Sequence, residues 1–561
     1  MVKERKFWAD RYVDLIQKRV EEEELLQKIV LDKGYICYDE KTPSGKIHIG
    51  SGRGWVIHDT VARALRDAGL KGRFILSADD LDPMDSLPDE DKDYYEQFMG
   101  IPFRFIPSPE KGYESYADYY FKQATSKFSE YGIEAELERT GDHYFNGDFN
   151  RTVKLALDRA NYIQKIYSRF YNNTVMSNSL PFKPICEQCK KIGSTIAYEW
   201  DKNSELLKYR CSEDFVEWAK GCGHEGEISP YNGNGKLPWK VEWAAKWPTI
   251  GVVFETAGKD HFSAGGSRDV SIAISKEIFD YPPPFPSSCK KTEKGFSYKT
   301  GEFYEFFTIG GAKMSSSKGS GFPFSEMGNY APGYIVKFLL VRTRPKSAID
   351  FDPVKDLERV YRDYDENERK YYSARQNSSL LENDEYFNAY RLYELCHVGK
   401  ILPKEPEQIE FNFGVMLVQV TDTTEQAIAR LIEKGYLSSN ISAKNKSLIK
   451  SRLEFLRKWV KELAPNEVLI HLIHNNSLKL SSDEKLMIKD LISLIKESDQ
   501  SEKILVEGIK MLYTSYNISV KEFHTKMYNI LFKKPSGPRL VPYIIYAGED
   551  KIIDHLYKYC E

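Results

Sequence analysis

The stretch Thr42-Pro43-Ser44-Gly45-Lys46-Ile47-His48-Ile49-Gly50 decides how the first part of this chain folds. It follows an apolar run at 35–38 and precedes a segment, 55–65, whose apolar residues recur at helical spacing. The order is therefore strand, tight turn and helix. Small residues at 50–52 leave the start of the helix open, so its free N–H groups and positive dipole end can receive a phosphate. His48 can donate to a phosphate oxygen there and stabilise charge that develops in a transition state.

A second stretch, Lys313-Met314-Ser315-Ser316-Ser317-Lys318-Gly319, has the composition of a phosphate-gripping loop. It follows a strand-like segment at 302–308 and two glycines, and its lysines and hydroxyls suit a polyphosphate. Taken singly, the histidine is more often a packing or solvated residue, and the lysine loop is equally typical of a solvated surface. Both together, in this order and far apart in the chain, favour one nucleotide site.

These two stretches resemble the signature motifs of class I aminoacyl-tRNA synthetases, and the neighbouring residues narrow the resemblance to class I lysyl-tRNA synthetases of the archaeal type. Two positions depart from the family pattern: Ser51 stands where the family usually has asparagine, and Ser316 where the wider class often has the second loop lysine. The second departure moves the expected phosphate contact to Lys318. The matching segments run through most of the chain and are 7–10, 43–45, 48–50, 79–80, 82–84, 235–243, 258–261, 265–267, 313–319, 348–352 and 537–539.

The resemblance and the periodicity together predict an α/β fold. A Rossmann-like nucleotide-binding parallel sheet carries an inserted zinc-bearing domain and is followed by an all-helical C-terminal domain. A chain of 561 residues has room for about three or four domains. The expected limits are an N-terminal helix at 1–33, a catalytic domain in two halves at 34–82 and 244–330, an insertion at 83–243 with the zinc cluster at 186–224, a connecting helical region at 331–375, and a helical anticodon-binding domain at 376–561.

Four of the eight cysteines lie close together in the predicted insertion. Cys186 and Cys189 have the two-residue gap that lets both thiolates reach one tetrahedral ion from a tight knuckle. With Cys211 and Cys222 downstream they predict a closed, structural zinc site, which four protein ligands leave without a position for a catalytic water. The pattern leaves open whether His224 replaces Cys211 as a ligand.

The resemblance also implies which residues handle ATP. His48, Lys313 and Lys318 are expected to be catalytic, with the two lysines closing on the β and γ phosphates while Mg²⁺ shares their charge. Asp260 is expected to accept the ribose hydroxyls. The full set of expected ATP-binding residues is Pro43, Ser44, Gly45, Gly50, Gly258, Asp260, His261, Met314, Ser315 and Ser316.

A lysine substrate needs flat apolar walls for its stem and a carboxylate for its ammonium groups. Asp79 and Asp80 end the second predicted strand, at 72–77, and the carboxyl ends of parallel strands collect ligands. Glu255 ends another strand, at 250–255, and Trp243 offers a wall. These four are the candidate lysine-binding residues, although the two aspartates are nearly as well explained by helix capping. Sequence leaves open which carboxylate meets which amine.

Composition is that of an ordinary globular protein with a formal net charge of -3, so any RNA surface must be a local basic patch. No apolar run is long enough to span a membrane, and the charged residues at 1–6 are not followed by a signal-type core. We therefore expect a cytoplasmic protein with no membrane or DNA partner.

The implied reaction joins L-lysine to the 3' terminal adenosine of tRNA(Lys) through a lysyl-adenylate made from ATP. The nearest rival is a class I synthetase for another amino acid, chiefly glutamate, whose pocket should present arginines. Two more distant hypotheses are a nucleotidyltransferase acting on a small substrate and a zinc-containing RNA-binding protein without activity.

Overall fold

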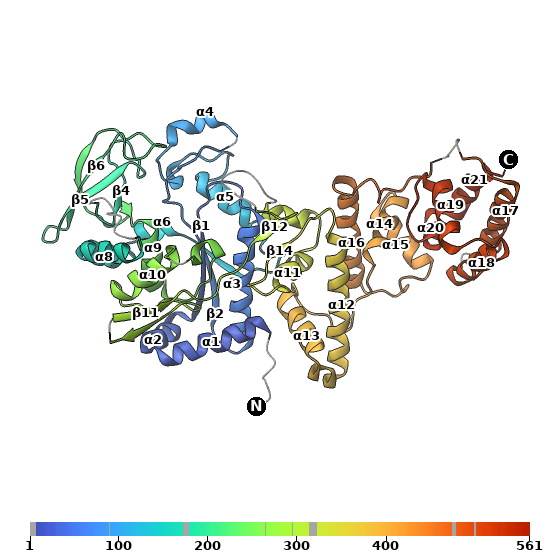
Figure 1. Ribbon diagram of the computed structural model, residues 1–561, viewed down its shortest axis with the longest axis horizontal. Helices are drawn as coiled ribbons and strands as arrows, with labels where there is room; N and C mark the ends of the chain where they lie inside the picture. The colour runs from blue at the N-terminus through green and yellow to red at the C-terminus, as the bar shows by residue number, and fades with distance from the viewer. Residues whose placement is uncertain are drawn as a thin grey trace. The chain divides into compact units, whose positions relative to one another are not determined.

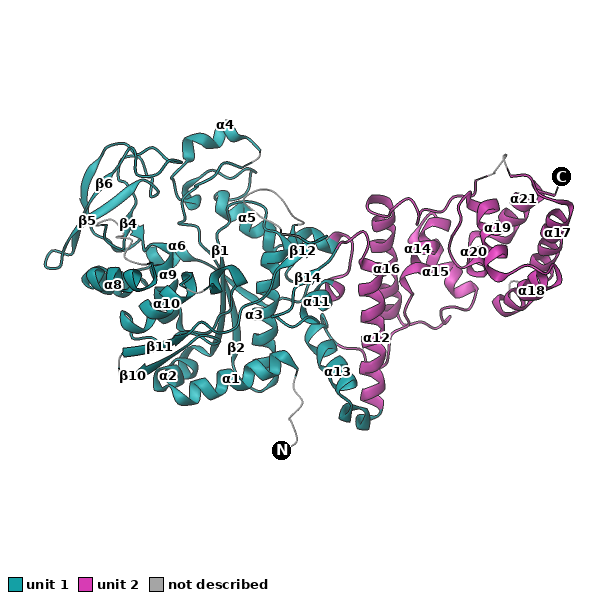
Figure 2. Cartoon of the chain, viewed as in Figure 1, with its two compact units in different colours: residues 1–328, 336–351, 377–400 teal, residues 329–335, 352–376, 401–561 magenta. Residues whose placement is uncertain are grey.

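The computed structural model describes residues 7–88, 90–171, 179–263, 265–293, 295–313, 323–473, 478–498 and 501–560, with the backbone alone at 312–313 (Figure 1). The chain forms two compact units (Figure 2). Unit 1 comprises Met1–Gly328, Val336–Phe351 and Asn377–Lys400, and unit 2 comprises Asn329–Ile335, Asp352–Gln376 and Ile401–Glu561. The domain limits expected from the sequence remain predictions.

A four-stranded parallel sheet organises unit 1, in the order β3-β2-β1-β9. The chain runs from β1 to β2 and β3 on one side and returns to β9 on the other, which places a topological switch point at β1. Open α/β sheets bind ligands at such a point. The predicted Rossmann-like sheet is thus confirmed. The strands are β1 (Tyr35–Lys41), β2 (Gly72–Ala78), β3 (Ala135–Arg139) and β9 (Val252–Phe254).

Two of these strands differ from their sequence-based expectation. Strand β3 lies inside the segment predicted to be an insertion, so the sheet takes strands from three stretches of the chain. Strand β9 is shorter than the strand expected at 250–255, because residues Trp247–Gly251 form a π-helical turn. Such turns are rare and often occur at functional sites.

Side chains alternate between the two faces of strand β1, as the period of a β-strand requires. Helix α3 (Ile49–Asp67) covers the face of Asp39, where its His58 comes within 3.5 Å of the carboxylate. Helix α9 (Trp239–Lys246) covers the face of Glu40, where Lys246 lies 2.5 Å from the carboxylate. The sheet is therefore sandwiched between helices, and the two faces of β1 meet different charges.

The N-terminal segment forms two helices where the sequence predicted one. Helix α1 (Trp8–Glu22) and helix α2 (Glu24–Lys33) are separated by Glu23, whose backbone is extended. Four consecutive glutamates at 21–24 bring like charges together, which disfavours a continuous helix there. The break lets each helix bury its own apolar residues, Trp8 and Tyr12 in α1 and Leu26 in α2.

The remaining elements of unit 1 are short helices and four small sheets. The helices are α4 (Lys92–Tyr95), α5 (Tyr116–Thr125), α6 (Thr140–Phe145), α7 (Asn150–Asp158), α8 (Ala160–Phe170), α10 (Ser267–Glu277) and α13 (Asp384–Cys396). The sheets pair β4 (Lys183–Pro184) with β8 (Gly235–Lys236), β5 (Thr195–Asp201) with β6 (Leu206–Cys211) and β7 (Glu225–Ile228), β10 (Ser288–Thr292) with β11 (Gly295–Lys299), and β12 (Phe307–Ile309) with β13 (Ala312–Lys313) and β14 (Ile349–Asp350).

Unit 2 is helical, and no strand occurs among its described residues. Arg452 and Asp365 form an ion pair in its core at 2.7 Å, with the guanidinium over the ring of Tyr361. Several helices begin at a serine whose hydroxyl accepts the backbone N–H three residues on, the usual N-cap arrangement. The helices are α12 (Leu357–Gln376), α14 (Phe411–Val420), α15 (Thr424–Glu433), α16 (Ala443–Glu462), α17 (Ser482–Glu497), α18 (Glu502–Ser515), α19 (Val520–Phe532), α20 (Leu540–Ala547) and α21 (Glu549–Tyr557). Helix α11 (Gly333–Val341) crosses the limit between the units.

Within the described ranges, no helix combines the length and apolar character needed to cross a bilayer.

Candidate active site and metal centre

A pocket of about 350 Å³ opens at the carboxyl ends of β1, β2 and β9. Its walls come from the residues that end or follow these strands, from helices α3 and α9, and from the segment before β12. Aromatic rings and carboxylates share the lining, which is the composition expected for a site that holds an apolar stem with charged ends. The lining residues are Asp39, Glu40, Lys41, Thr42, Ser51, Trp55, Asp79, Asp82, Trp239, Trp243, Glu255, Thr256, Ala257, Gly258, His261 and Tyr304.

Two buried lysines neutralise the carboxylates on the α9 side of the pocket. The Lys236 ammonium lies 2.8 Å from Asp79 and 3.0 Å from Glu242, and Lys246 lies 2.9 Å from Glu242 and 3.5 Å from Asp79. Burial opposes ionisation of Asp79, but the two ammonium groups hold its pKa below the usual range. Burial and the nearby Asp79 raise the pKa of Glu242 to about 8. Asp79, expected to bind lysine, therefore lines the pocket but already has protein cations as partners.

Glu255 is held in a similar way at the end of β9. Arg268 lies 2.5 Å from its carboxylate, and the indole N–H groups of Trp243 and Trp247 donate to it at 2.7–3.0 Å. The Arg268 guanidinium stacks over both indole rings. Two candidate lysine-binding residues, Glu255 and Trp243, are thus joined in one hydrogen-bonded group at the pocket wall.

Asp80 lies outside the lining. Its carboxylate accepts from Arg104 at 2.7 Å and from the backbone N–H of Gly141 at 2.8 Å. Burial raises the pKa of this carboxyl although Arg104 opposes the change. The side chain of Asp80 thus faces the start of α6, while Asp79 beside it faces the pocket.

The His48 turn contacts the segment that follows the lysine loop. His48 is the residue before helix α3 and has an extended backbone, and it forms an isolated antiparallel bridge with Pro323. The backbone N–H of Phe324 donates to Ile47 at 3.0 Å, and its ring occupies the space beside Gly52, where a Cβ would lie 2.0 Å from it. Met314, Ser315, Ser316 and Lys318 lie outside the described residues, as does the side chain of Lys313. The first described residue after the lysine loop is therefore joined to the histidine turn.

The expected nucleotide-binding residues fall on two segments. Pro43, Ser44, Gly45 and Gly50 belong to the turn between β1 and α3 and to its first residues. Beyond β9, Gly258 and His261 line the pocket, and Asp260 lies between them in the 3-10 turn Lys259–Phe262. The backbones of Gly258 and Tyr304 form a parallel bridge, which fixes this turn beside the segment that leads to the lysine loop.

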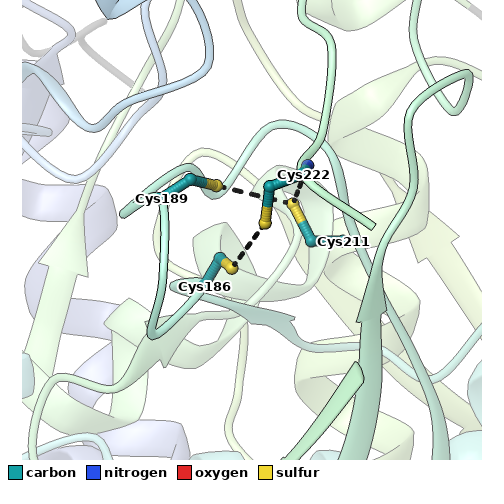
Figure 3. A group of neighbouring side chains, drawn as sticks. All are labelled: Cys186, Cys189, Cys211 and Cys222. Atoms are coloured by element: carbon teal, nitrogen blue, oxygen red, sulfur yellow. Dashed lines mark hydrogen bonds between the residues drawn. The ribbon is translucent and has the colours of Figure 1, made fainter. Parts of the chain in front are cut away.

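The four predicted cysteine ligands come together at the small β5-β6-β7 sheet (Figure 3). The sulfurs of Cys186 and Cys222 are 3.6 Å apart, as are those of Cys189 and Cys211. A tetrahedral ion with bonds of about 2.3 Å to sulfur separates its ligands by about 3.8 Å, so the four thiols fit one metal ion. His224 is not part of this group, and its Nε2 lies 3.8 Å from the carboxylate of Glu187.

The sequence reasoning missed several pocket residues on and after β1, namely Asp39, Glu40, Lys41 and Thr42, and it missed Tyr304. A signal was available for the first three. Three consecutive charged residues directly after the apolar run of a buried parallel strand are unusual, because such strands are covered on both faces. Tyr304 had no such signal, since only the fold brings it to the pocket.

Comparison with known proteins identifies the family. The model of the family described as tRNA synthetases class I (K) matches residues 6–397, more than half of the chain. The chain belongs to the class I lysyl-tRNA synthetases. The family explains the arrangement of the pocket at the switch point of a Rossmann-like sheet, beside the histidine turn.

Proteins similar to this synthetase over nearly its whole length carry the name lysine–tRNA ligase. The one from Methanocaldococcus jannaschii is 29% identical over 551 residues, which cover 97% of this chain and 98% of that protein. The one from Pyrococcus horikoshii is 28% identical over 567 residues, with coverages of 98% and 99%. A solved glutamate tRNA ligase from Elizabethkingia meningosepticum is 12% identical, with a TM-score of 0.39 and coverages of 94% and 99%.

Proposed function

We propose that the chain is a lysine–tRNA ligase that activates L-lysine with ATP and transfers it to the 3' terminal adenosine of tRNA(Lys). The observation that carries this proposal is the carboxylate-rich, aromatic-walled pocket at the switch point of a class I lysyl-tRNA synthetase. Such a pocket suits an alkyl chain that ends in ammonium groups. No arginine is among the described residues that line it, as a glutamate side chain would require.

In the first step the lysine carboxylate attacks the α-phosphorus of ATP and pyrophosphate leaves. In the second, a ribose hydroxyl of the tRNA terminus attacks the activated carbonyl and AMP leaves. Neither step needs a nucleophile from the protein, which contributes positioning and charge stabilisation. His48 would bind the triphosphate at the start of α3, with Lys313 and Lys318 on the β and γ phosphates and Mg²⁺ sharing their charge.

We assign the remaining site residues on the same basis. The turn residues Pro43, Ser44, Gly45 and Gly50, the segment with Gly258, Asp260 and His261, and the loop residues Met314, Ser315 and Ser316 would bind ATP. Asp79, Glu255 and Trp243 would shape the lysine site, because all three line the pocket. Asp80 is the weaker candidate, since its carboxylate is already bonded to Arg104 and Gly141.

The test is ATP–pyrophosphate exchange against a panel of amino acids, with and without tRNA(Lys). Lysine should support exchange and glutamate should not. By resemblance to the family we also expect activation to require bound tRNA, so equal exchange rates with and without tRNA would remove that part of the proposal. Exchange with glutamate in place of lysine would favour the rival assignment. Exchange with neither would favour the two more distant hypotheses, a nucleotidyltransferase acting on a small substrate or a zinc-containing RNA-binding protein without activity.

We propose that the four-cysteine group holds a structural Zn²⁺, which would fix the loops of the β5-β6-β7 sheet. Freshly purified protein should contain one zinc per chain by elemental analysis. Cys211→Ser should lose the metal, whereas Cys289→Ser, outside the group, should keep it. Loss of zinc in neither variant, or no zinc in the unaltered protein, would contradict this assignment.

The same family resemblance supports the two tRNA-binding regions. The zinc-bearing segment would contact the acceptor end, and the helical unit 2 would bind the anticodon arm by backbone charge and by stacking of unpaired bases on aromatic rings.

A further inference from the structure

The carboxylates in the pocket differ in whether they have a cation as a partner. Asp79 pairs with Lys236 and Lys246, Asp82 with Lys236 at 2.7 Å, and Glu255 with Arg268. Glu40 pairs with Lys246. A buried carboxylate without such a partner is strongly disfavoured, so each of these four is stable without any ligand.

Asp39 is the exception. Its Oδ1 accepts the backbone N–H of Glu40 at 2.8 Å, and no lysine or arginine of the described chain lies within ion-pair distance of it. His58 approaches to 3.5 Å but supplies no charge. Its Nδ1 lies 2.7 Å from the carbonyl of Gly54, and its Nε2 accepts the backbone N–H of Thr256 at 3.2 Å. An imidazole that accepts at one nitrogen is neutral.

Lys41 is the matching exception among the cations. It follows Asp39 by two residues on β1, so both side chains belong to the same face of the strand, and both residues line the pocket. Within the described ranges the side chain of Lys41 makes no hydrogen bond and no ion pair, and burial lowers the pKa of its ammonium group. Asp39 and Lys41 thus influence each other's charge from the same face of the strand, and no other described lysine, arginine or carboxylate forms an ion pair with either.

Gly54 lets the Tyr304 hydroxyl and the Asp39 carboxylate lie close to the backbone of α3. A Cβ on Gly54 would lie 2.7 Å from the hydroxyl of Tyr304 and 2.8 Å from the Asp39 carboxylate. Glycine at this position of α3 therefore allows both groups to face the pocket. The Tyr304 hydroxyl adds a hydrogen-bonding group beside the carboxylate.

We propose that Asp39 and Lys41 bind the head group of the amino acid, with the α-ammonium on Asp39 and the α-carboxylate on Lys41. This inference rests on the proposed function, in that the pocket is the amino acid site. A free α-amino acid carries an ammonium and a carboxylate on one carbon, so it can form an ion pair with Asp39 and another with Lys41 at the same time. Lys41 is then a positioning residue for the carboxylate that attacks ATP.

The experiment compares ligands that each lack one group of lysine. 6-Aminohexanoate lacks the α-ammonium, cadaverine lacks the carboxylate and norleucine lacks the side-chain ammonium. Inhibition constants are measured in pyrophosphate exchange with tRNA present, for the unaltered enzyme, Asp39→Asn and Lys41→Met. Glu136→Gln, an exposed carboxylate on the edge strand β3, serves as the control.

The unaltered enzyme and Glu136→Gln should bind lysine about tenfold or more tighter than 6-aminohexanoate or cadaverine, as expected for charge-assisted hydrogen bonds. Asp39→Asn should remove most of the preference over 6-aminohexanoate and leave the preference over norleucine unchanged. Lys41→Met should remove most of the preference over cadaverine alone. Each preference is the ratio of two binding constants measured on the same variant. A loss of folded protein affects both constants equally and does not change the ratio.

The proposal is overturned if Asp39→Asn instead removes the preference over norleucine, which would place the side-chain ammonium on Asp39. It is also overturned if no ratio changes, which would make Asp39 and Lys41 structural. Failure of the proposed function is seen separately, as the absence of lysine exchange in the unaltered enzyme. Should that enzyme activate another amino acid, the same comparison with its own deaminated and decarboxylated analogues still tests the head-group site.

Discussion

The charged side chains on the two faces of strand β1 differ in whether they have ion-pair partners. On the α9 face, Glu40 belongs to a closed network in which two lysines meet the carboxylates of Asp79 and Glu242. On the α3 face, Asp39 and Lys41 have no ion-pair partners among the described lysines, arginines and carboxylates, and the nearby imidazole of His58 is neutral. The network on the α9 face stabilises the fold without a ligand. On the α3 face, which we call the open face, Asp39 and Lys41 can still form ion pairs with a ligand. Binding sites are often less stable than their surroundings for this reason.

The largest loss of stability should come from removing a lysine from the ion-pair network on the α9 face. Lys246→Met would leave the buried carboxylate of Glu40 without an ion-pair partner, which should lower the free energy of unfolding by about 3–5 kcal/mol. Urea unfolding measures it. Adding Glu40→Gln to this variant should recover part of the loss. The matched control is Lys208→Met, which removes an exposed pair with Glu199 and should leave the free energy of unfolding nearly unchanged. A loss equally small for Lys246→Met would show that the network is not closed.

The next effect concerns the neutral histidine of the open face. Burial lowers the pKa of His58 from 6.5 to about 4, so the unfolded chain binds a proton that the folded chain excludes between these values. The contribution of His58 to stability is therefore full above pH 6.5 and falls as pH decreases to about 4, by about 3 kcal/mol.

Glu242 acts in the opposite direction, because its raised pKa makes the folded chain bind the extra proton up to about pH 8. The stability difference between the unaltered protein and His58→Gln isolates the histidine. That difference should shrink from pH 7 to pH 4.5 in unfolding titrations, and a difference independent of pH would mean that His58 is not held neutral.

The lysine loop should give a smaller effect, confined to the reaction. Lys313→Ala and Lys318→Ala should each slow adenylation by about tenfold or more, about 1.4 kcal/mol, because charge stabilisation is lost in the transition state. The affinity for lysine should change little. Pre-steady-state measurement of adenylate formation separates the two quantities, with Lys299→Ala on β11 as the control. A change confined to the KM for lysine would contradict this role.

The smallest effect should be that of Asp39→Asn on stability without ligands. Burial raises the pKa of the Asp39 carboxyl well above its ordinary value, so ionisation of this group opposes folding at neutral pH. The asparagine keeps an oxygen for the N–H of Glu40 and carries no charge. Thermal unfolding at pH 8 should show a variant as stable as the unaltered protein or more stable by up to about 1 kcal/mol. A marked loss would mean that Asp39 has a stabilising partner.

The sequence predicted much of the fold because its strongest local signals survive folding. The apolar run before the histidine turn became β1, the glycine-bounded run after the first long helix became β2, and the Cys-x-x-Cys knuckle met the two later cysteines. The N-terminal helix was wrong in its continuity, since periodicity alone does not register the break at Glu23. The strand expected at 250–255 was too long, because residues Trp247–Gly251 form a π-helical turn. In this turn the indole of Trp247 donates a hydrogen bond to Glu255.

Sequence alone determined the order of strand, turn and helix, the cysteine spacing and the number of charges near the strand ends, because these depend on neighbours a few residues apart. Tertiary structure alone decided which charges are neutralised. Lys236 and Asp79 are 157 residues apart, yet they form the pair that leaves Asp79 without need of a ligand. Asp39 and Asp79 both follow the apolar part of a strand and look alike in the sequence. They differ because folding brings lysines to Asp79 and a neutral histidine to Asp39.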